Sequence, residues 1–325
     1  MSRRSASGKL PAWVEPQLAT LTRDRFSDPE WLFERKLDGE RCLTFADDQG
    51  IKLMSRNQRD ITTTYPEIAD ALTAQSTAPG QILDGEIVAF RGSATSFSQL
   101  QQRLGLLHPS PNLISSVPVT YYIFDIMFSG GQDVRPLPQR ERKQLLRSLM
   151  SFEDPLRYTE HRERDGQKYY EQACRDRWEG LIAKRASAPY RSGRTRDWLK
   201  FKCENAQEFV IGGFTDPQGS RQGLGALLLG YYDTDGQLNY AGKVGTGFSE
   251  AVLQQLHAAL SELERDSPSF DVGQLPRTRV HWVEPRLVAE VGFSEWTPDG
   301  QLRHPRYQGL RDDKAPAEVV RETPA

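Results

Sequence analysis

Short runs of alternating hydrophobic and polar residues fill much of the chain, and this pattern predicts more strands than helices. In the first two hundred residues, clusters of Gly, Asp, Asn and Pro separate the runs. The strands predicted there are residues 31–36, 41–45, 51–55, 82–90, 120–128, 180–185 and 198–202. Helical spacing is found in residues 65–73 and 138–150. We therefore expect an α+β unit dominated by antiparallel strands.

The pattern changes after Glu204, where five short strands are interrupted by one helix. The predicted strands are residues 208–214, 225–232, 238–242, 280–283 and 287–295, and one helix is predicted over residues 249–263. Five strands with one helix suit a small Greek-key barrel such as the OB-fold, which often binds nucleic acids. We therefore expect one domain over residues 1–205 and a second over residues 206–325.

Length and composition agree with two soluble globular domains. The chain has 325 residues, of which 37% are hydrophobic and 26% are charged. The longest apolar stretch, residues 119–128, is about half as long as a membrane-spanning helix requires. The amino terminus is basic but has no apolar segment, so it does not resemble a secretory signal. These features predict a cytoplasmic protein that does not contact a membrane.

The three cysteines, Cys42, Cys174 and Cys203, are widely spaced and form no C-x-x-C pair. We therefore expect neither a zinc site nor a disulfide framework. The net charge of −2 argues against binding of nucleic acid through overall basicity. Residues 177–204 nevertheless contain eight Lys and Arg against three Asp and Glu, a local charge of +5. Such a run is usually a solvated face, so any phosphate binding must depend on local patches.

A lysine suited to nucleophilic chemistry lies in residues 34–41, which read ERKLDGER. Lys36 ends a predicted strand, and Asp38 and Gly39 predict a tight turn into the next strand. Such a hairpin would place the lysine amine in a cleft between strands. K-x-D-G alone also occurs by chance, and an exposed hairpin with a solvated lysine explains it equally well.

Six further motifs follow Lys36 in a characteristic order. They are SRN at 55–57, LDGE at 83–86, YYIFD at 121–125, EGLIAKR at 179–185, WLKFK at 198–202 and RDDK at 311–314. Together they resemble the motifs of covalent nucleotidyltransferases, specifically ATP-dependent DNA ligases. The segments 240–248 and 289–314 resemble the ligase domain of the bacterial end-joining ligase D. The resemblance covers nearly the whole chain and implies a nucleotidyltransferase (adenylation) domain followed by an OB-fold domain.

The resemblance implies that Lys36 attacks the α-phosphorus of ATP and forms a phosphoramide with AMP. Lys200 and Lys202 lie two residues apart on one strand, so both ammonium groups share a face and can meet the α-phosphate oxygens. Asp38 would orient Lys36 or the 3′-hydroxyl. Lys36 must first lose its proton, and nearby Mg²⁺ and lysines would lower its pKa from about 10.4.

The remaining roles implied by the resemblance concern the nucleotide and the metal. Glu179 would bind Mg²⁺ or Mn²⁺, and Glu86 would hold either the ribose or the metal. Phe124 would stack on adenine, although it also fits a plain core position. Glu34 would accept a hydrogen bond from the adenine amino group and so favour ATP over GTP.

Basic residues would contact the phosphates, and arginine suits this because its planar guanidinium forms paired hydrogen bonds. The resemblance assigns Arg41 and Arg56 to the phosphates of the nick and the adenylate, and Lys184 to the nucleotide. The carboxy-terminal motif residues would reach the β and γ phosphates only when the two lobes close. These residues are Arg311, Asp313 and Lys314.

The implied partners are nicked or broken double-stranded DNA, with Ku and an end-joining polymerase, for a monomer in the bacterial cytoplasm at the nucleoid. Because only 35 residues precede Lys36, we expect no helical DNA-binding domain and a weak grip on DNA. The alternatives are an mRNA capping guanylyltransferase, an RNA ligase, and a catalytically silent DNA-binding module. An NAD-dependent ligase would need an extra amino-terminal domain and a cysteine zinc module.

Overall fold

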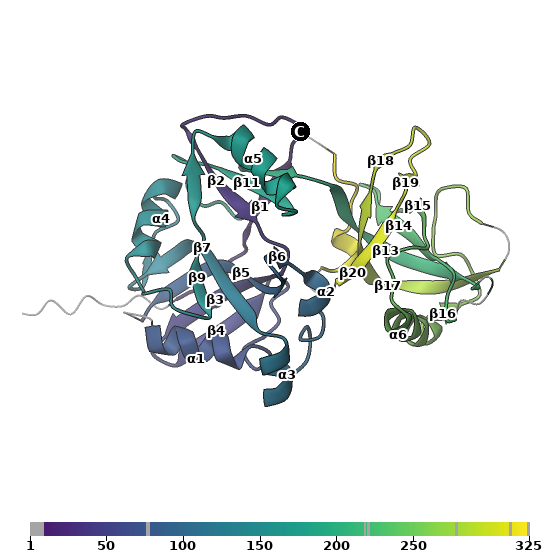
Figure 1. Cartoon of the computed structure of the whole chain (residues 1–325), viewed down its shortest axis with the longest axis horizontal. Helices are drawn as coiled ribbons and strands as arrows, with labels where there is room; N and C mark the ends of the chain where they lie inside the picture. Colours follow the sequence, from purple (N-terminus) through teal and green to yellow (C-terminus); the bar gives the residue numbers. More distant parts are fainter. Residues whose placement is uncertain are drawn as a thin grey trace, which may run out of the picture. The chain divides into compact units, whose positions relative to one another are not determined.

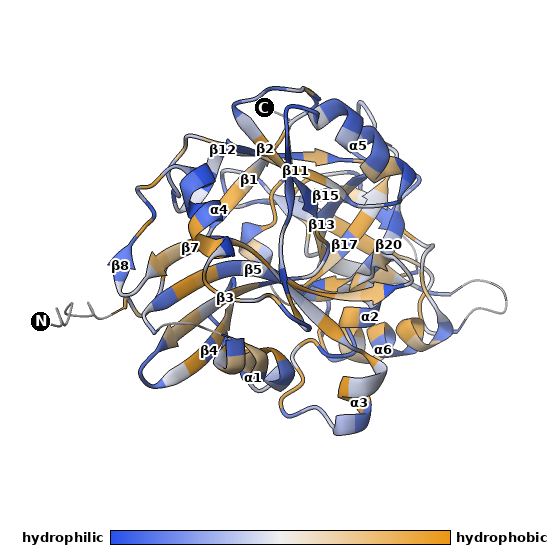
Figure 2. Ribbon diagram, turned by 60° about the vertical axis from the view of Figure 1, so that its left-hand side comes forward, coloured by the Kyte–Doolittle hydropathy of each residue, from blue (hydrophilic) through white to orange (hydrophobic). Residues whose placement is uncertain are grey.

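The structure is a computed structural model that describes residues 10–75, 79–217, 219, 222–276, 279–311 and 314–323. The chain forms two compact units, of which the first ends at Cys203 and the second covers Glu204–Thr323. The first is an α+β unit, and the second is built around one sheet with, among its described residues, a single α-helix (Figure 1). Hydrophobic residues gather along the central strands (Figure 2).

The first sheet of unit 1 has the strand order β1-β12-β11-β2-β10. The strands are β1 (Gln17–Leu21), β2 (Trp31–Lys36), β10 (His161–Glu163), β11 (Gly180–Arg185) and β12 (Gly193–Lys202). All pairs are antiparallel except β1 with β12. Helix α5 (Gly166–Arg175) packs on β11 and β2, where Phe33, Leu181 and Phe201 form a buried core (Figure 1).

The second sheet of unit 1 has the order β4-β3-β5-β7-β8 and holds the largest core. Its strands are β3 (Glu40–Asp47), β4 (Gly50–Ser55), β5 (Gln81–Arg91), β7 (Val119–Ser129) and β8 (Gln132–Asp133), and the short β6 (Ala94–Thr95) and β9 (Leu156–Tyr158) pair with β5 and β7. The helices around it are α1 (Pro66–Gln75), α2 (Phe97–Leu100), α3 (Pro111–Ser116) and α4 (Gln139–Arg147). Most predicted strands and both predicted helices are therefore present.

The predicted hairpin after Lys36 is wrong, because β2 and β3 belong to different sheets. Instead of folding back, the chain crosses from one sheet to the other between Lys36 and Glu40. Gly39 makes this crossing possible, since a Cβ at this position would lie 2.1 Å from the carbonyl oxygen of Ile87 on β5. Lys36 therefore stands where the two sheets are joined.

Unit 2 is organised around the strand order β15-β14-β13-β17-β16, with β20 paired to β17. Its elements are β13 (Asn205–Thr215), β14 (Leu227–Tyr232), β15 (Leu238–Val244), α6 (Glu250–Ser261), β16 (Glu264–Arg265), β17 (Val280–Phe293), β18 (Glu295–Trp296), β19 (Leu302–Arg303), β20 (Arg306–Arg311) and a 3-10 turn, η1 (Pro316–Glu318). Ser249 caps α6 by accepting a hydrogen bond from the Val252 N–H at 3.3 Å. This arrangement is the small OB-fold domain that the strand pattern predicts.

The two strands predicted over residues 280–283 and 287–295 form the single strand β17. Near Pro285 the pairing with β13 shifts, so that Ile211 faces Leu287 while Gly213 faces Trp282. Proline lacks an N–H and interrupts a ladder of hydrogen bonds, but here a bulge accommodates it and the strand continues.

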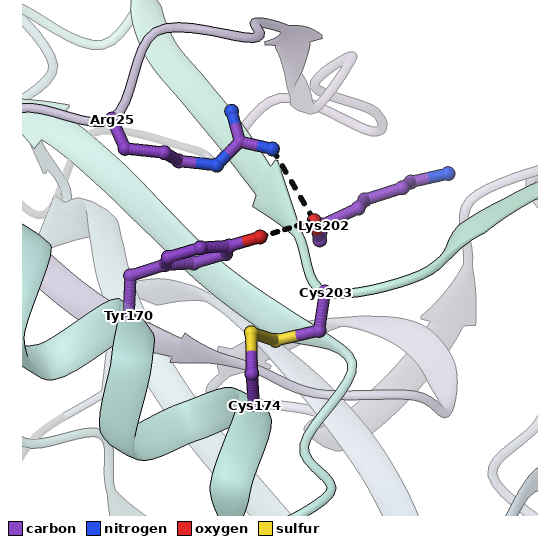
Figure 3. Close-up of a disulfide and its surroundings, with 5 residues drawn as sticks. All are labelled: Arg25, Tyr170, Cys174, Lys202 and Cys203. Carbon is purple, nitrogen blue, oxygen red and sulfur yellow. Dashed lines mark hydrogen bonds between the residues drawn. A yellow bond between two sulfur atoms is a disulfide. The ribbon is translucent and has the colours of Figure 1, made fainter.

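The prediction that the cysteines form no disulfide is wrong. Cys174 lies near the end of α5 and Cys203 directly follows β12, and their Cα atoms are 5.3 Å apart. Their sulfur atoms are bonded (Figure 3), whereas Cys42 is a buried free thiol. Spacing in the sequence did not reveal this pair, because helix α5 was not predicted.

Within the described part of the chain, no helix has both the length and the apolar character needed to cross a membrane.

Candidate active site

Strand β11 brings the candidate catalytic lysines together. Gly180 on β11 is opposite Lys36 of β2 on one side and Lys202 of β12 on the other. Directly opposed residues in an antiparallel sheet project to the same face, and so do residues two apart on one strand. Lys36, Lys202 and Lys200 therefore share one face of the first sheet.

Lys36 is ion-paired with Glu179, the residue that precedes β11. The Nζ atom lies 2.5 Å from Oε1 of Glu179, and the two side chains are 19% and 21% exposed. Burial is the largest single influence and lowers the pKa of Lys36, but the charge and hydrogen bond of Glu179 together with the charge of Asp38 raise the pKa overall. Lys202 acts in the opposite direction, because a second positive charge nearby lowers the pKa of Lys36. Lys36 is thus held as an ammonium in the absence of substrate.

Gly180 allows Glu179 to reach this position. Its φ of +147° is unusual for other residues, and a Cβ would lie 1.9 Å from the Phe201 carbonyl oxygen. A side chain here would push β12 away from β11. The glycine of the EGLIAKR motif therefore keeps the strand that carries Lys200 and Lys202 close to Glu179.

Glu34 lies two residues before Lys36 on the same face of β2 and is buried between two lysines. Its Oε1 lies 2.8 Å from the Nζ atom of Lys143, and its Oε2 lies 2.7 Å from that of Lys184. All three side chains are almost completely buried. Burial lowers the pKa of Lys184, although Glu34 opposes this. Sequence reasoning missed Lys143, because charged residues on a helix usually face solvent.

Arg41 and Phe124 connect the second sheet to the same region. Arg41 donates to both carboxylate oxygens of Asp84, at 2.5 Å from Nε and 2.7 Å from Nη2. Its guanidinium lies 4.6 Å from the centre of the Phe124 ring, and the Lys184 Nζ lies 4.3 Å from that centre. Phe124 is only 9% exposed and belongs to a hydrophobic core. The Arg41 and Lys184 cations both lie over its ring. Its stacking on adenine stays a prediction.

The other candidate residues of unit 1 lie on the second sheet or between the sheets. Glu86 of β5 is directly opposite Arg41 of β3. Arg56 lies in the turn that follows β4. Asp38 lies in the segment joining the sheets, where its charge contributes to the raised pKa of Lys36.

In unit 2, the two described residues of the RDDK motif lie beside acidic residues of the central strands. The Nζ atom of Lys314 is 2.9 Å from Oε2 of Glu208, and Nη1 of Arg311 is 3.8 Å from Oε2 of Glu290. Glu208 and Glu290 are directly opposed on β13 and β17. Asp313 lies outside the described residues.

The basic run 177–204 does not form one solvated patch. Lys184 is buried, and Asp197 pairs with both Arg185 at 3.5 Å and Arg191 at 2.5 Å. Lys200 and Lys202 lie on the sheet face that they share with Lys36. The positive charge of this run is therefore divided among separate sites.

Comparisons with known proteins place this chain in a family. A family model described as "ATP dependent DNA ligase domain" matches residues 16–202, which is more than half of the chain. A second model, "ATP dependent DNA ligase C terminal region", matches residues 220–314.

Individual relatives agree with the family models. The multifunctional non-homologous end joining protein LigD of Pseudomonas aeruginosa is 37% identical over 333 residues, covering 100% of this chain and 39% of that protein. The LigD of Mycobacterium bovis is 39% identical over 315 residues, covering 95% of this chain and 40% of that protein. The chain thus spans about two fifths of the length of these relatives.

A solved structure agrees as well. It is described as "mycobacterial DNA ligase D complexed with ATP and MES", and it is 36% identical, covers 95% of this chain and 98% of its own, and has a TM-score of 0.67. With family models matching residues 16–202 and 220–314 and relatives up to 39% identical, this chain belongs to the ATP-dependent DNA ligase family.

Proposed function

We propose that this protein seals breaks in DNA by way of a covalent Lys36–AMP intermediate. Lys36 attacks the α-phosphorus of ATP and pyrophosphate departs. AMP then passes to the 5′-phosphate at a break, and the 3′-hydroxyl displaces AMP. The observation that supports this most directly is the shared face of Lys36, Lys200 and Lys202, because all three steps are phosphoryl transfers that need cations at the phosphate.

The proton of Lys36 determines whether it can attack. The ion pair with Glu179 holds the proton, since this pairing raises the pKa of Lys36. When Lys36 leaves Glu179, it loses the largest influence that raises its pKa, while burial and the charge of Lys202 still lower the pKa and the smaller influence of Asp38 still raises it. Departure from Glu179 is therefore the step that prepares the nucleophile.

Glu179 also suits a divalent metal. Among the described residues, none donates a hydrogen bond to its buried Oε2 atom, which leaves a hard oxygen ligand available. We propose that Glu179, with Glu86 as a second carboxylate, holds Mg²⁺ or Mn²⁺, which would neutralise charge on the phosphates.

Glu34 and its two lysines are proposed to recognise the base. Lys143 and Lys184 hold the Glu34 carboxylate in a fixed, buried position, where it can accept a hydrogen bond from the adenine amino group. Guanine presents a carbonyl at the equivalent position, and a carboxylate would repel it. This contact favours ATP over GTP.

The relatives support a proposal about the biological role. The similar LigD proteins are named for non-homologous end joining, and we propose that this chain acts in the same repair process on nicked or broken DNA. Arg41 and Arg56 are proposed to contact the phosphates, and Ku and a polymerase are proposed as partners of a bacterial, nucleoid-associated enzyme. Arg41 is already bound to Asp84, so it presents its remaining N–H groups in a fixed direction.

The test is a labelling assay with ATP carrying a labelled α-phosphate, after pyrophosphate has discharged any existing adduct. Lys36→Arg should fail to take up label as completely as Lys36→Ala, because arginine keeps the charge but does not lose its proton at working pH. Nick sealing should require ATP and fail with GTP or NAD. Label on the arginine variant would show that Lys36 is not the nucleophile.

A further inference from the structure

The end of β12 is held by helix α5 at two adjacent points. Tyr170 donates its hydroxyl to the carbonyl oxygen of Lys202 at 3.0 Å, and Cys174 is bonded to Cys203, the next residue (Figure 3). Tyr170 and Cys174 are four residues apart, so they lie on the same face of the helix. Helix α5 therefore contacts the chain at Lys202 through a hydrogen bond and at Cys203 through the disulfide.

Arg25 completes this arrangement from the amino-terminal segment. Its Nη2 donates to the same Lys202 carbonyl at 3.3 Å, and its guanidinium lies 4.8 Å from the centre of the Tyr170 ring (Figure 3). The Lys202 carbonyl thus accepts two hydrogen bonds outside the sheet. These contacts fix the backbone from which the Lys202 side chain projects toward Lys36.

The disulfide is placed where exchange with a small thiol is possible. Cys174 and Cys203 are both partly exposed, whereas the free Cys42 is buried. Cys203 is also the last residue of unit 1, and Glu204 begins unit 2. A change at this bond therefore acts next to a catalytic lysine and at the link between the units.

We propose that Cys174 and Cys203 form a redox-sensitive clasp that positions Lys202, so that thiol–disulfide exchange at this pair adjusts the rate of self-adenylation. The clasp rests on the proposed role of Lys202 at the α-phosphate. Tyr170 and Arg25 are positioning residues in the same arrangement, because they contact Lys202 through its backbone carbonyl.

A small thiol such as glutathione can reduce the disulfide by thiol–disulfide exchange. Its thiolate attacks one sulfur of the Cys174–Cys203 bond and forms a mixed disulfide, and a second thiol releases glutathione disulfide. Two electrons and two protons are then carried by the Cys174 and Cys203 thiols. Glutathione disulfide reverses the reaction by accepting the two electrons.

The reduced form should still fold, because other contacts hold β12. The Cys203 N–H donates to the Glu179 carbonyl at 3.0 Å, and the Tyr170 and Arg25 hydrogen bonds remain. The loss is therefore partial. We expect reduction to lower kcat for Lys36–AMP formation by about three- to tenfold, with KM for ATP changed by less than about twofold, since small misplacement of a transition-state contact affects kcat first.

The experiment measures single-turnover adenylation of the full chain in its oxidised form, after dithiothreitol, and after reoxidation by glutathione disulfide. Mass spectrometry verifies each state, and every assay is run well below the melting temperature. Reduction should slow adenylation and reoxidation should restore it. Cys174→Ser should equal the reduced protein and show no response to dithiothreitol, whereas Cys42→Ser should respond as the parent does.

Tyr170→Phe separates positioning from simple stability, because it removes only the hydroxyl that donates to Lys202. It should lower kcat in both redox states. Equal rates in the oxidised and reduced protein would overturn the clasp while leaving the proposed function intact, and so would an equal dithiothreitol effect in Cys174→Ser. Absence of a Lys36–AMP adduct in every state would overturn the proposed function and the clasp together.

Discussion

The aspartate of the YYIFD motif offers a sharp test of how the site is supported. Asp125 on β7 and Arg142 on α4 form an ion pair in which both side chains are 0% exposed. Arg142 Nε donates to Oδ1 at 2.8 Å and Nη2 donates to Oδ2 at 3.0 Å, while Gln139 donates to Oδ2 at 2.9 Å. The next residue on α4 is Lys143, which pairs with Glu34. Asp125 thus anchors the helix that holds Glu34.

Asp125→Asn keeps the shape of the side chain but removes its charge. The guanidinium of Arg142 is then buried without a counter-ion, and the new amide group points an N–H toward it. Breaking one side of a buried pair costs about 3–5 kcal/mol. For a unit of about 200 residues this corresponds to a fall in melting temperature of about 6–20 °C.

Asp133 provides a matched control, because it forms the same paired geometry at the surface. Arg135 Nε donates to its Oδ1 at 2.9 Å and Nη2 to its Oδ2 at 2.7 Å, but the side chains are 31% and 39% exposed. Asp133→Asn should cost less than about 1 kcal/mol. Calorimetry of both variants decides the matter, and equal shifts in the two would refute the argument from burial.

Three further predictions concern the site and its ligands. Gly180→Ala should lower the melting temperature and abolish adenylation. Gly50 is the control, because its φ is also positive, +125°, but a Cβ there would meet nothing within 4 Å. Gly50→Ala should therefore only weaken stability. Binding to nicked DNA should lose affinity steeply between about 50 and 200 mM salt, with a slope of about 0.9 per phosphate contact; constant affinity would contradict it. Lys314→Ala should block Lys36–AMP formation yet seal a nick already carrying AMP, because pyrophosphate leaves only in the first step; loss of both activities in a folded variant would instead place Lys314 on the DNA.

The strands were predicted best where alternation and burial agree. Residues 31–36 and 180–185 were predicted with the bounds that β2 and β11 have, since both are central strands with a buried hydrophobic side. Which strands pair with each other could be predicted less well from the sequence. An Asp-Gly pair favours a hairpin locally, but Gly39 instead serves a close approach to Ile87, which depends on a strand far along the chain.

The disulfide and the lysine that pairs with Glu34, Lys143, were missed for a related reason. Cys174 and Lys143 lie on helices whose charged sequences look solvated, so neither the pairing with Cys203 nor that with Glu34 is visible locally. Both depend on which helix face packs on which sheet. That choice is made by core residues such as Tyr169 and Ala173 of α5, which bury against β11.

The order of the motifs in the sequence does not reveal which acidic residues pair with the basic motif residues. Each of four basic motif residues has an acidic partner in the structure: Lys36 with Glu179, Arg41 with Asp84, Lys184 with Glu34 and Lys314 with Glu208. A chain with net charge −2 can therefore hold many phosphate-binding residues without strong repulsion among them. In the proposed mechanism, phosphates would replace some of these carboxylates, since a cation cannot serve both fully at once. Nucleotide binding would then exchange ion pairs, and the carboxylates released, Glu179 above all, would become available for the metal.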